Sequence, residues 1–427
     1  MALLDTLFNE GFLLESCWKN LNKSNEDSFG ISGESISTFA HNLESRLSSI
    51  SKDLKEGNYH FGPNRAAIIP KDNGKFRPLQ IPEIADRIVL KGIAILLEEE
   101  LAPILKKGDR VSFAYQKKLG VKAAILKMLE LYKEGYTIIL EADIENFFPS
   151  VDRKSLLDVI FKSLPDTSLN KLIEEGLNQK IEGLDKIKAS ERKLFSSNST
   201  GIPQGNPLSP LFSNIFLADF DEQMKYAGFK VIRYADDFIV MCKDHNEAKR
   251  AYELAQKILE GQLKLKLHPL RSGLNSKTKI VNPTKDLFSF LSVTFDGKTI
   301  FPSRKSVDRY KQKIDNLCNG PNKTVFDILN GVKFSIDGWV STYSYTDCKR
   351  YFREIDAYID RQVFLAIRKF DWRFTNKVSG KLPSKFRKTG ESSECLSKKQ
   401  RSGSGIQYCH EIYSMRTQST VTIKSPK

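Results

Sequence analysis

Two short apolar segments of the sequence place aspartates where a strand ends or turns. The segment TIILEAD (137–143) predicts a buried strand that ends at Asp143. The segment VIRYADDFIVMC (231–242) predicts a hairpin of two apolar arms with Asp236 and Asp237 at its tip. The middle third of the chain must therefore hold a sheet, and helical periodicity on either side of these strands gives alternating strands and helices there.

The three aspartates carry the clearest chemical signal. Carboxylates crowded at low dielectric repel one another by several kcal/mol unless cations neutralise them, and oxygen ligands suit hard divalent ions. We therefore assign Asp143, Asp236 and Asp237, together with Ile144, to a site for two Mg²⁺ ions, with Mn²⁺ as the other ion that fits. Two ions ~3.5–4 Å apart would stabilise the attacking and leaving oxygens of a phosphoryl displacement. For any single aspartate, the alternative is a turn residue that keeps a strand end soluble.

The charge balance favours a polyanionic partner. The chain has 427 residues, with 67 Lys and Arg against 52 Asp and Glu, and its net charge is +15. Such a surface attracts nucleic acid through counterion release, although a merely solvated basic surface is the alternative. The sequence has no run of ~18 apolar residues that could span a membrane, and its first residues lack a basic signal-peptide region. We expect a cytoplasmic protein with no membrane contact.

Periodicity divides the rest of the chain into helical and extended regions. Apolar residues at spacings of three and four predict a helix over 36–54. The segment KDNGKFRPLQIP (71–82) predicts a basic hairpin that turns at Asn73-Gly74. Residues 373–427 carry 12 Lys and Arg against 3 acids with many Ser, Thr and Gly, which is typical of a poorly packed basic tail.

A second hairpin and two helices are predicted before this tail. The segment FLSVTFDGKTIFPS (290–303) predicts a hairpin with Asp296-Gly297 as a type I′ turn. After Ser303, apolar stripes predict helices over about 303–318 and 352–367, and the first of these carries many Lys and Arg on its other faces.

Seven segments follow one another along residues 59–300: IPKDNGKFRPLQIPEIADRIVLKGI (69–93), SFAYQKKLG (112–120), LEADIENFFPSVD (140–152), GIPQGNPLSPLFSNIFLADFD (201–221), VIRYADDFIV (231–240), LKLKLHPLRSGLNSKTKI (263–280) and FSFLSVTFDGKTI (288–300). In this order they resemble the sequence blocks of bacterial reverse transcriptases related to group II intron enzymes. The combination is highly specific. The later segment GWVSTYSY (338–345) is similar to part of the family's thumb.

The resemblance implies an α+β fold, the right-hand polymerase, whose palm has an antiparallel sheet and whose thumb is helical. The implied domains are an N-terminal helical extension at 1–58, fingers at 59–136, a palm at 137–302 with a helical insertion at about 152–198, a thumb at 303–372 and a basic C-terminal tail at 373–427.

The resemblance also implies which residues bind the incoming deoxynucleotide. Lys71, Lys75 and Arg77 on the basic hairpin would bind its triphosphate, with Arg77 as a bidentate donor. Each of the three is, taken singly, compatible with a solvated surface charge.

Three further residues complete the nucleotide site that the resemblance implies. Phe148 matches the aromatic ring that excludes a 2′-hydroxyl, with Phe147 as a core residue. Gln204 in the segment before the palm helix would hydrogen-bond nucleotide or template. Lys277 would lie near the leaving pyrophosphate as a general acid or as a compensating charge.

Nucleic-acid contacts are implied in two further places. Tyr234 stands beside the aspartate pair, and Gly297 lies in a hairpin similar to the primer-gripping element of the family. On the basic helix, four residues would follow the phosphates of an RNA–DNA duplex: Arg304, Lys305, Arg309 and Lys313.

Departures from the family's branches favour one of them. We find no nuclease module, no retron blocks and no fused integrase, and Ser209-Pro210 stands where diversity-generating enzymes tend to carry Ser-Gln. The chain most resembles free-standing antiphage-defence reverse transcriptases, which copy a structured non-coding RNA template with dNTPs. The alternatives are a maturase that binds intron RNA and a template-independent DNA polymerase of the abortive-infection type. A homo-oligomer remains open.

Overall fold

The computed structural model describes residues 2–70, 74–195, 200–273, 276–321, 323–370 and 395–420. The chain divides into two compact units, Met1–Val281 and Asn282–Lys427, which are described separately. In the described residues, no helix is both long and apolar enough to span a bilayer.

The first unit is a mixture of helices and strands. Its α-helices are α1 (Leu3–Leu7), α2 (Glu10–Phe12), α3 (Ile36–Ala40), α4 (Leu43–Lys55), α5 (Ile84–Glu100), α6 (Ala102–Leu105), α7 (Val121–Lys133), α8 (Phe147–Ser150), α9 (Arg153–Ser163), α10 (Asn170–Leu177), α11 (Ala189–Arg192), α12 (Ser209–Phe216), α13 (Ala218–Tyr226) and α14 (His245–Gln256). Its strands are β1 (Asn64–Pro70), β2 (Phe76–Ile81), β3 (Ile138–Asp143), β4 (Ile181–Glu182), β5 (Lys230–Tyr234), β6 (Asp237–Cys242) and β7 (Lys279–Val281).

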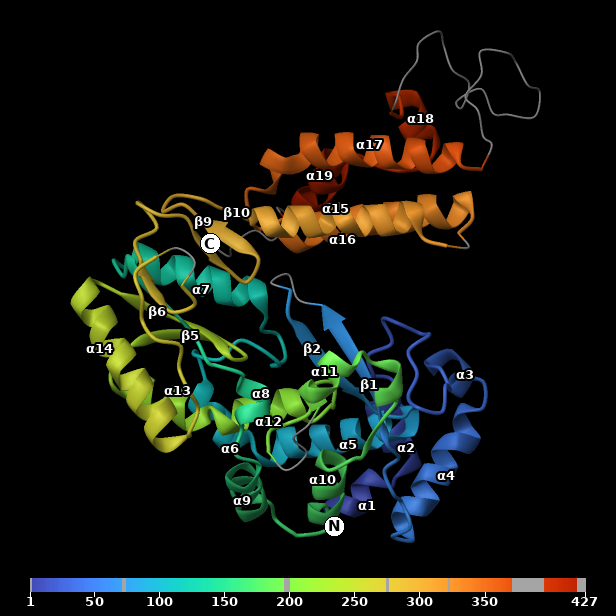
Figure 1. Cartoon of the computed structure of the whole chain (residues 1–427), viewed down its shortest axis with the longest axis vertical. Helices are drawn as coiled ribbons and strands as arrows, with labels where there is room; N and C mark the ends of the chain where they lie inside the picture. The colour runs from blue at the N-terminus through green and yellow to red at the C-terminus, as the bar shows by residue number, and fades with distance from the viewer. Residues whose placement is uncertain are drawn as a thin grey trace, which may run out of the picture. The chain divides into compact units, whose positions relative to one another are not determined.

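A four-stranded antiparallel sheet in the order β5-β6-β3-β7 carries the aspartates of this unit. Figure 1 shows its strands β5 and β6 near α7 and α14. Strands β3 and β6 are apolar almost throughout, because α14 packs against both and α7 packs against β5 and β6. A strand that is covered in this way reads as a continuous apolar run in the sequence. The TIILEAD and VIRYADDFIVMC segments form β3 and the β5–β6 hairpin, and the α+β fold class is confirmed.

The predicted basic hairpin is present as β1 and β2, whereas the predicted N-terminal helix is divided in two. Strands β1 and β2 pair in antiparallel register from Arg65 opposite Ile81 to Pro70 opposite Phe76, and β4 adds to β1 in parallel. Asn73, expected in the turn, lies outside the described residues. The single helix predicted over 36–54 is instead two helices, α3 and α4, because Asn42 leaves the helical region with φ −121° and ψ 36°.

The second unit contains a small sheet and a helical bundle. The sheet has the order β10-β9-β8, from β8 (Phe288–Phe290), β9 (Val293–Phe295) and β10 (Ile300–Pro302). The helices are α15 (Arg304–Asn319), α16 (Val325–Tyr343), α17 (Phe352–Arg368), α18 (Lys398–Gly403) and α19 (Cys409–Thr420). Helices α15, α16 and α17 pack against one another, and α19 packs on α16 and α17 (Figure 1).

The division between the units falls inside the range expected for the palm, because residues 288–302 form a sheet of their own. The domain ranges therefore stay predictions.

The expected type I′ turn at Asp296-Gly297 is wrong. Phe295 pairs with Ile300, so the loop between β9 and β10 has four residues. A type I′ turn needs positive φ at both central residues, whereas Gly297 has φ +83° and Asp296 is outside that region. The Asp296 carboxylate instead accepts hydrogen bonds from the backbone N–H groups of Lys298 and Thr299, which favours the longer loop.

Residues 373–394 and 421–427 of the expected poorly packed tail lie outside the described residues, and for residues 395–416 the expectation is wrong. Leu396, Ile406 and Cys409 are buried there, and the Arg401 side chain is fully buried. Its guanidinium forms ion pairs with Asp356 at 2.6 Å and Asp360 at 3.0 Å, both on α17. A charged residue inside a basic stretch therefore anchors this segment to the bundle.

Loss of this anchor should destabilise the second unit. We expect Arg401→Ala to lower the free energy of unfolding by roughly 3–5 kcal/mol, because Asp356 and Asp360 would be left with an unpaired charge in a largely buried place. The matched control is Arg416→Ala, which breaks the half-exposed pair with Asp337 and should cost about 1 kcal/mol or less. Urea unfolding followed by circular dichroism measures both, and equal losses would contradict the anchoring role.

Candidate active site

The pairing of β3 with β6 brings the predicted aspartates to one end of the central sheet. Asp143, the last residue of β3, lies directly opposite Asp237, the first residue of β6. Such opposed residues have Cβ atoms about 4.5–5.5 Å apart. Tyr234, the last residue of β5, also pairs with Asp237, so the turn between β5 and β6 has two residues, Ala235 and Asp236. The backbone therefore gathers three carboxylates that are distant in the sequence.

The turn that carries Asp236 has an unusual backbone. Ala235, its first residue, has φ +60°, a left-handed conformation that costs a residue with a Cβ atom roughly 1–2 kcal/mol. Because this conformation persists in a buried alanine, the surrounding structure must hold it in place. Its result is a tight turn that sets Asp236 and Asp237 side by side.

Removal from water and the crowding of these carboxylates both affect the pKa of Asp237. Its side chain still reaches solvent at the edge of the site. Partial removal from water, followed by the charges of Asp236, Asp143 and Glu141, raises the pKa of Asp237 to about 7, while Lys277 lowers it. A raised carboxylate pKa means that the negative charge is costly here. The site therefore favours a bound cation.

Lys277 neutralises part of this charge in the structure. Its Nζ atom forms an ion pair with Asp143 Oδ2, and it lies 3.1 Å from His268 Nε2. His268 in turn lies 3.5 Å from Asp143 Oδ2 and, through Nδ1, 3.1 Å from Glu145 Oε1. The backbone fixes His268 there, because its N–H donates to the Asp143 carbonyl at 3.1 Å.

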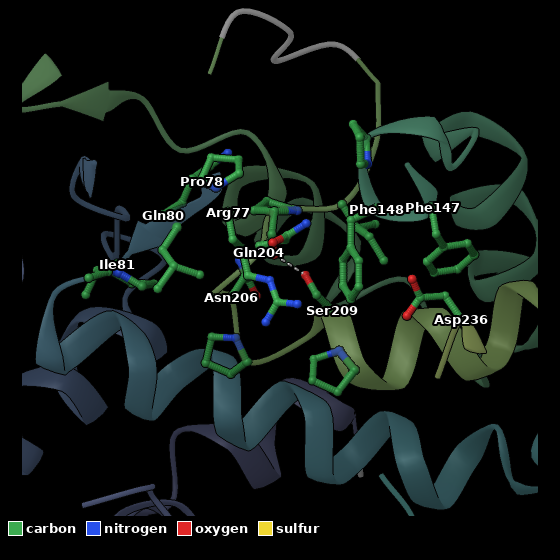
Figure 2. A pocket seen from close by; sticks show the side chains of 18 of the residues that line it. Arg77, Pro78, Gln80, Ile81, Phe147, Phe148, Gln204, Asn206, Ser209 and Asp236 are labelled. Atoms are coloured by element: carbon green, nitrogen blue, oxygen red, sulfur yellow. Dashed lines mark hydrogen bonds between the residues drawn. The ribbon is translucent and has the colours of Figure 1, made fainter. Parts of the chain in front are cut away.

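A cavity of about 910 Å³ opens beside Asp143, Ile144 and Asp236. Arg77 of β2, Phe148 of α8, Gln204 and Lys277 line it as well, so four of the six residues expected to bind nucleotide face one space. In the view of Figure 2, the Phe148 ring lies between Gln204 and Asp236, with Arg77 beside Gln204. The volume and the mixture of cationic, amide and aromatic groups suit a nucleotide.

One wall of the cavity is a loop that needs glycine. Gly205 has φ +107°, and a Cβ atom there would lie 2.6 Å from the carbonyl oxygen of Gln80. This close approach lets the Gln80 N–H of β2 donate to the Gln204 carbonyl at 2.8 Å. The Gln204 side-chain oxygen is buried and has no hydrogen-bond partner among the described residues. It can accept a hydrogen bond from a ligand.

Adjacent phenylalanines point to different surroundings. Asn146, with φ +46°, turns the chain after β3 into α8. Both phenylalanines line the cavity, but Phe147 is buried in the core, whereas Phe148 is only partly buried. Their rings meet edge to face with centroids 5.5 Å apart, so the buried ring braces the more exposed one.

Other predicted site residues lie elsewhere. Lys71 lies outside the described residues, and Lys75 is exposed and is not among the residues that line the cavity. Gly297 and four basic residues of α15 belong to the second unit. All four of these basic residues are exposed: Arg304, Lys305, Arg309 and Lys313. Arg304 also forms ion pairs with Asp308 and Glu354.

Sequence reasoning assigned no role to two residues at this site. Tyr115 lines the cavity with 52% of its surface exposed, and His268 contacts Lys277 and lies beside Asp143. Burial raises the pKa of Tyr115, and so do the nearby charges of Asp236 and Asp237. The sequence did offer one signal for both residues: they lie in segments that resemble the family, SFAYQKKLG and LKLKLHPLRSGLNSKTKI.

Opposed aspartates at the end of an antiparallel sheet, beside a basic hairpin and a nucleotide-sized cavity, define a polymerase site of the right-hand class. Comparison with known proteins agrees. Residues 69–295 match the family described as reverse transcriptase (RNA-dependent DNA polymerase). Because the match covers more than half of the chain, the protein belongs to the reverse transcriptase family and is an RNA-directed DNA polymerase with the right-hand fold.

Individual relatives share less than a third of their residues with the chain over the aligned regions. The chain is 27% identical to Protein YkfC of Escherichia coli (strain K12) over 328 residues, 68% of this chain and 81% of YkfC. It is 30% identical to the group II intron-encoded protein LtrA of Lactococcus lactis subsp. cremoris over 227 residues, 52% of this chain and 36% of LtrA. A solved partial Cas6-RT-Cas1–Cas2 complex aligns with 28% identity and a TM-score of 0.36, over 62% of this chain and 43% of that one.

Gly205 provides a test of the cavity wall. We expect Gly205→Ala to raise the KM for dNTP about tenfold or more, because the new Cβ would push the Gln204 segment away from Gln80. The matched control is Gly228→Ala, which has a similar left-handed φ of +85° but meets nothing within 4 Å. Both variants should lose about 1–2 kcal/mol of stability from a Cβ atom in the left-handed region, and Gly205→Ala should lose more because its Cβ also meets the Gln80 carbonyl. An unchanged KM in Gly205→Ala would contradict the assignment of this wall.

Proposed function

We propose that the protein synthesises DNA on an RNA template by nucleotidyl transfer with two Mg²⁺ ions. The observation that carries the proposal is the register of Asp143 opposite Asp237, beside a nucleotide-sized cavity that Asp143 and Asp236 line, in a member of the reverse transcriptase family. The net charge of +15 supports a nucleic-acid partner.

The donor set fits hard divalent cations. Asp143, Asp236 and Asp237 offer carboxylate oxygens, and Ile144 can offer only its backbone carbonyl. Within the described part of the chain, no three acidic, histidine or cysteine side chains are gathered closely enough to hold an ion as they stand. In this structure the Asp143 carboxylate is ion-paired with Lys277, which a bound cation would have to displace. Bound ions would supply charge stabilisation for the attacking and leaving oxygens.

Release of Lys277 from Asp143 would give this lysine a second use. Its ammonium group lines the same cavity as Arg77, so both cations can meet the triphosphate of a dNTP. Arg77 suits bidentate binding of phosphate oxygens, and Lys71 and Lys75 would add point charges from the hairpin. Lys277 would then serve the leaving pyrophosphate as a compensating charge or a general acid.

The duplex would follow the second unit. On α15, Lys305, Arg309 and Lys313 recur every four residues and therefore share one exposed face. A row of cations on one helix face suits a line of phosphates. We extend this role to Arg304, Tyr234 and Gly297 from the resemblance of their segments to the family.

For the biological role, we propose antiphage defence in the bacterial cytoplasm with a structured non-coding RNA as template. The support is the way in which the sequence blocks depart from other branches of the family, such as Ser209-Pro210 in the fourth block, which leaves the free-standing defence enzymes as the branch that the chain most resembles. Sequencing the nucleic acid that co-purifies from the native host tests this role. Complementary DNA of one small RNA is expected, whereas intron RNA without DNA product would favour a maturase and random-sequence DNA would favour template-independent synthesis.

The aspartates are the first target for the polymerase activity. In a primer-extension assay on an RNA template, Asp236→Asn and Asp237→Asn should each lose activity by roughly 10²-fold or more, because each removes a charge that holds a metal ion. Asp219→Asn is the control, because Asp219 is an exposed acid on α13 that pairs with Lys107.

Folding must be measured in parallel. Asp237→Asn removes a charge that Asp236 and Asp143 repel, so it should unfold at no lower a urea concentration than wild type. Full activity in a folded Asp236→Asn or Asp237→Asn variant would refute the metal assignment.

Phe148 should control the choice of sugar. Phe148→Ala is expected to lower the preference for dNTP over rNTP by roughly tenfold or more. A shaped apolar pocket discriminates against one extra hydroxyl by about 10²-fold, so the variant should lose a large part of this discrimination. Phe148→Tyr keeps the ring and should keep the preference. Single-nucleotide incorporation kinetics with matched dNTP and rNTP measure both, and unchanged selectivity in Phe148→Ala would show that the ring does not meet the sugar.

A further inference from the structure

A fully buried ion pair lies directly behind the active-site turn. Arg233 of β5 and Asp221 of α13 both have no solvent-exposed side-chain surface, and Arg233 Nε donates to Asp221 Oδ1 at 2.7 Å. Burying two charges costs several kcal/mol of desolvation for each, so an ion pair is a poor way to stabilise a core. Its value must lie in what it positions.

The other side of the guanidinium holds the turn. Arg233 Nη1 donates to the carbonyl oxygen of Ala235 at 2.8 Å and to Asn214 Oδ1 at 3.1 Å. Ala235 is the residue with the left-handed backbone, and Asp236 follows it. The hydrogen bond from Arg233 therefore ends at the peptide group that joins Ala235 to Asp236.

The same cluster holds a second segment. Phe113 N–H donates to the Arg233 carbonyl at 2.9 Å, and Arg233 N–H donates to the Val111 carbonyl at 2.8 Å. Asn214, on α12, donates from Nδ2 to the Ala114 carbonyl at 3.0 Å. The residue after Ala114 is Tyr115, which also has a left-handed backbone with φ +59°.

Tyr115 is placed to meet a ligand. About half of its side chain is exposed, and it lines the cavity together with Arg77 and Asp236. A bulky residue in a left-handed conformation is a strained one, and such strain is retained where the structure on both sides fixes it. Two strained residues, Ala235 and Tyr115, are thus fastened to one buried cluster, and the cavity is lined by Tyr115 and by Asp236, the residue after Ala235.

We propose that Arg233, Asp221 and Asn214 form a positioning cluster that sets the metal-binding turn and the nucleotide-side loop together, and that Tyr115 is a further residue contacting the incoming nucleotide. The inference rests on the proposed function of this site. Its consequence is that damage to the cluster weakens metal binding and nucleotide binding at once, whereas damage to Tyr115 weakens nucleotide binding alone.

Packing around Asp221 provides a second way to disturb the cluster. A Cβ atom on Gly108 would lie 2.8 Å from Asp221 Oδ2 and 3.3 Å from the Cβ of Ser112. Because the Asp221 carboxylate is held by Arg233, it cannot move away without breaking the pair. Gly108→Ala therefore displaces the cluster without altering any residue that lines the cavity.

The test uses the full chain and two measurements for each variant. The dissociation constant for Mg²⁺ comes from the rise of Tm with Mg²⁺ concentration in the absence of nucleotide. The KM for dNTP comes from primer extension at saturating Mg²⁺. The variants are Asn214→Ala, Gly108→Ala, Tyr115→Phe and Tyr115→Ala. The control is Ser213→Ala on α12, since Ser213 is also buried and, among the described residues, its hydroxyl donates to Ser209 of the same helix.

We expect Asn214→Ala and Gly108→Ala to raise both constants about five- to tenfold, the effect of one lost hydrogen bond in each site. Tyr115→Ala should raise only the KM for dNTP by a similar factor, Tyr115→Phe should show how much of this is due to the hydroxyl, and Ser213→Ala should change neither constant by more than about twofold.

Three results would overturn the inference. One is wild-type constants in folded Asn214→Ala and Gly108→Ala proteins, one is a change in the KM for dNTP without a change in Mg²⁺ affinity in both, and one is an unchanged KM in Tyr115→Ala. If Asn214→Ala does not fold, Gly108→Ala decides. Failure of the proposed function itself would appear separately, as a wild-type protein that does not extend a primer.

Discussion

The antiparallel register that sets Asp143 opposite Asp237 governs the rest of the active site. Opposed carboxylates repel, so this pairing is unfavourable by itself. It persists because the strands behind the carboxylates are buried: Ile139 and Leu140 of β3 and Val240 of β6 have no exposed surface. Because consecutive side chains point to opposite faces, both faces of these strands are buried, and a slip of one residue would exchange side chains between two closely packed faces and disrupt the packing of each. The core therefore holds the acids together against their own repulsion.

Because the fold keeps these carboxylates close together despite their repulsion, the site attracts cations. Lys277 and His268 already approach Asp143, and the cavity adds Arg77. A site with this balance can take up a divalent ion at the acidic end and a triphosphate at the basic end, and each makes the other more favourable. The Arg233 cluster has the opposite character, since its charges are matched, buried and fixed. Its rigidity supports a turn that would otherwise relax.

Local pattern was enough to predict much of the site. Strand β3 and the β5–β6 hairpin follow from apolar runs, and Asp143, Asp236 and Asp237 follow from their ends. The basic hairpin follows from its turn residues and charges. These features depend on neighbours in sequence, and the family resemblance then orders them in space.

What could not be predicted depends on partners far apart in the chain. Arg233 in an apolar strand gives no sign of Asp221, and Arg401 in a basic stretch gives no sign of Asp356 on α17. Composition made residues 395–416 look unpacked, because the charge that is fully neutralised in the fold counts as solvated in the sequence. The four-residue loop after Phe295 was not predicted because Asp-Gly fits several kinds of turn. The hydrogen bonds of the Asp296 side chain decide among them.

The central claim is that these three aspartates hold a pair of metal ions during synthesis. Electron paramagnetic resonance of the protein with Mn²⁺, a chain-terminated primer on an RNA template and the next dNTP tests it most directly. Two ions ~3.5–4 Å apart are magnetically coupled, so the account predicts the spectrum of a coupled Mn²⁺ pair that is lost in Asp143→Asn. A spectrum of isolated Mn²⁺ only, or a coupled pair that survives in Asp143→Asn, would contradict it.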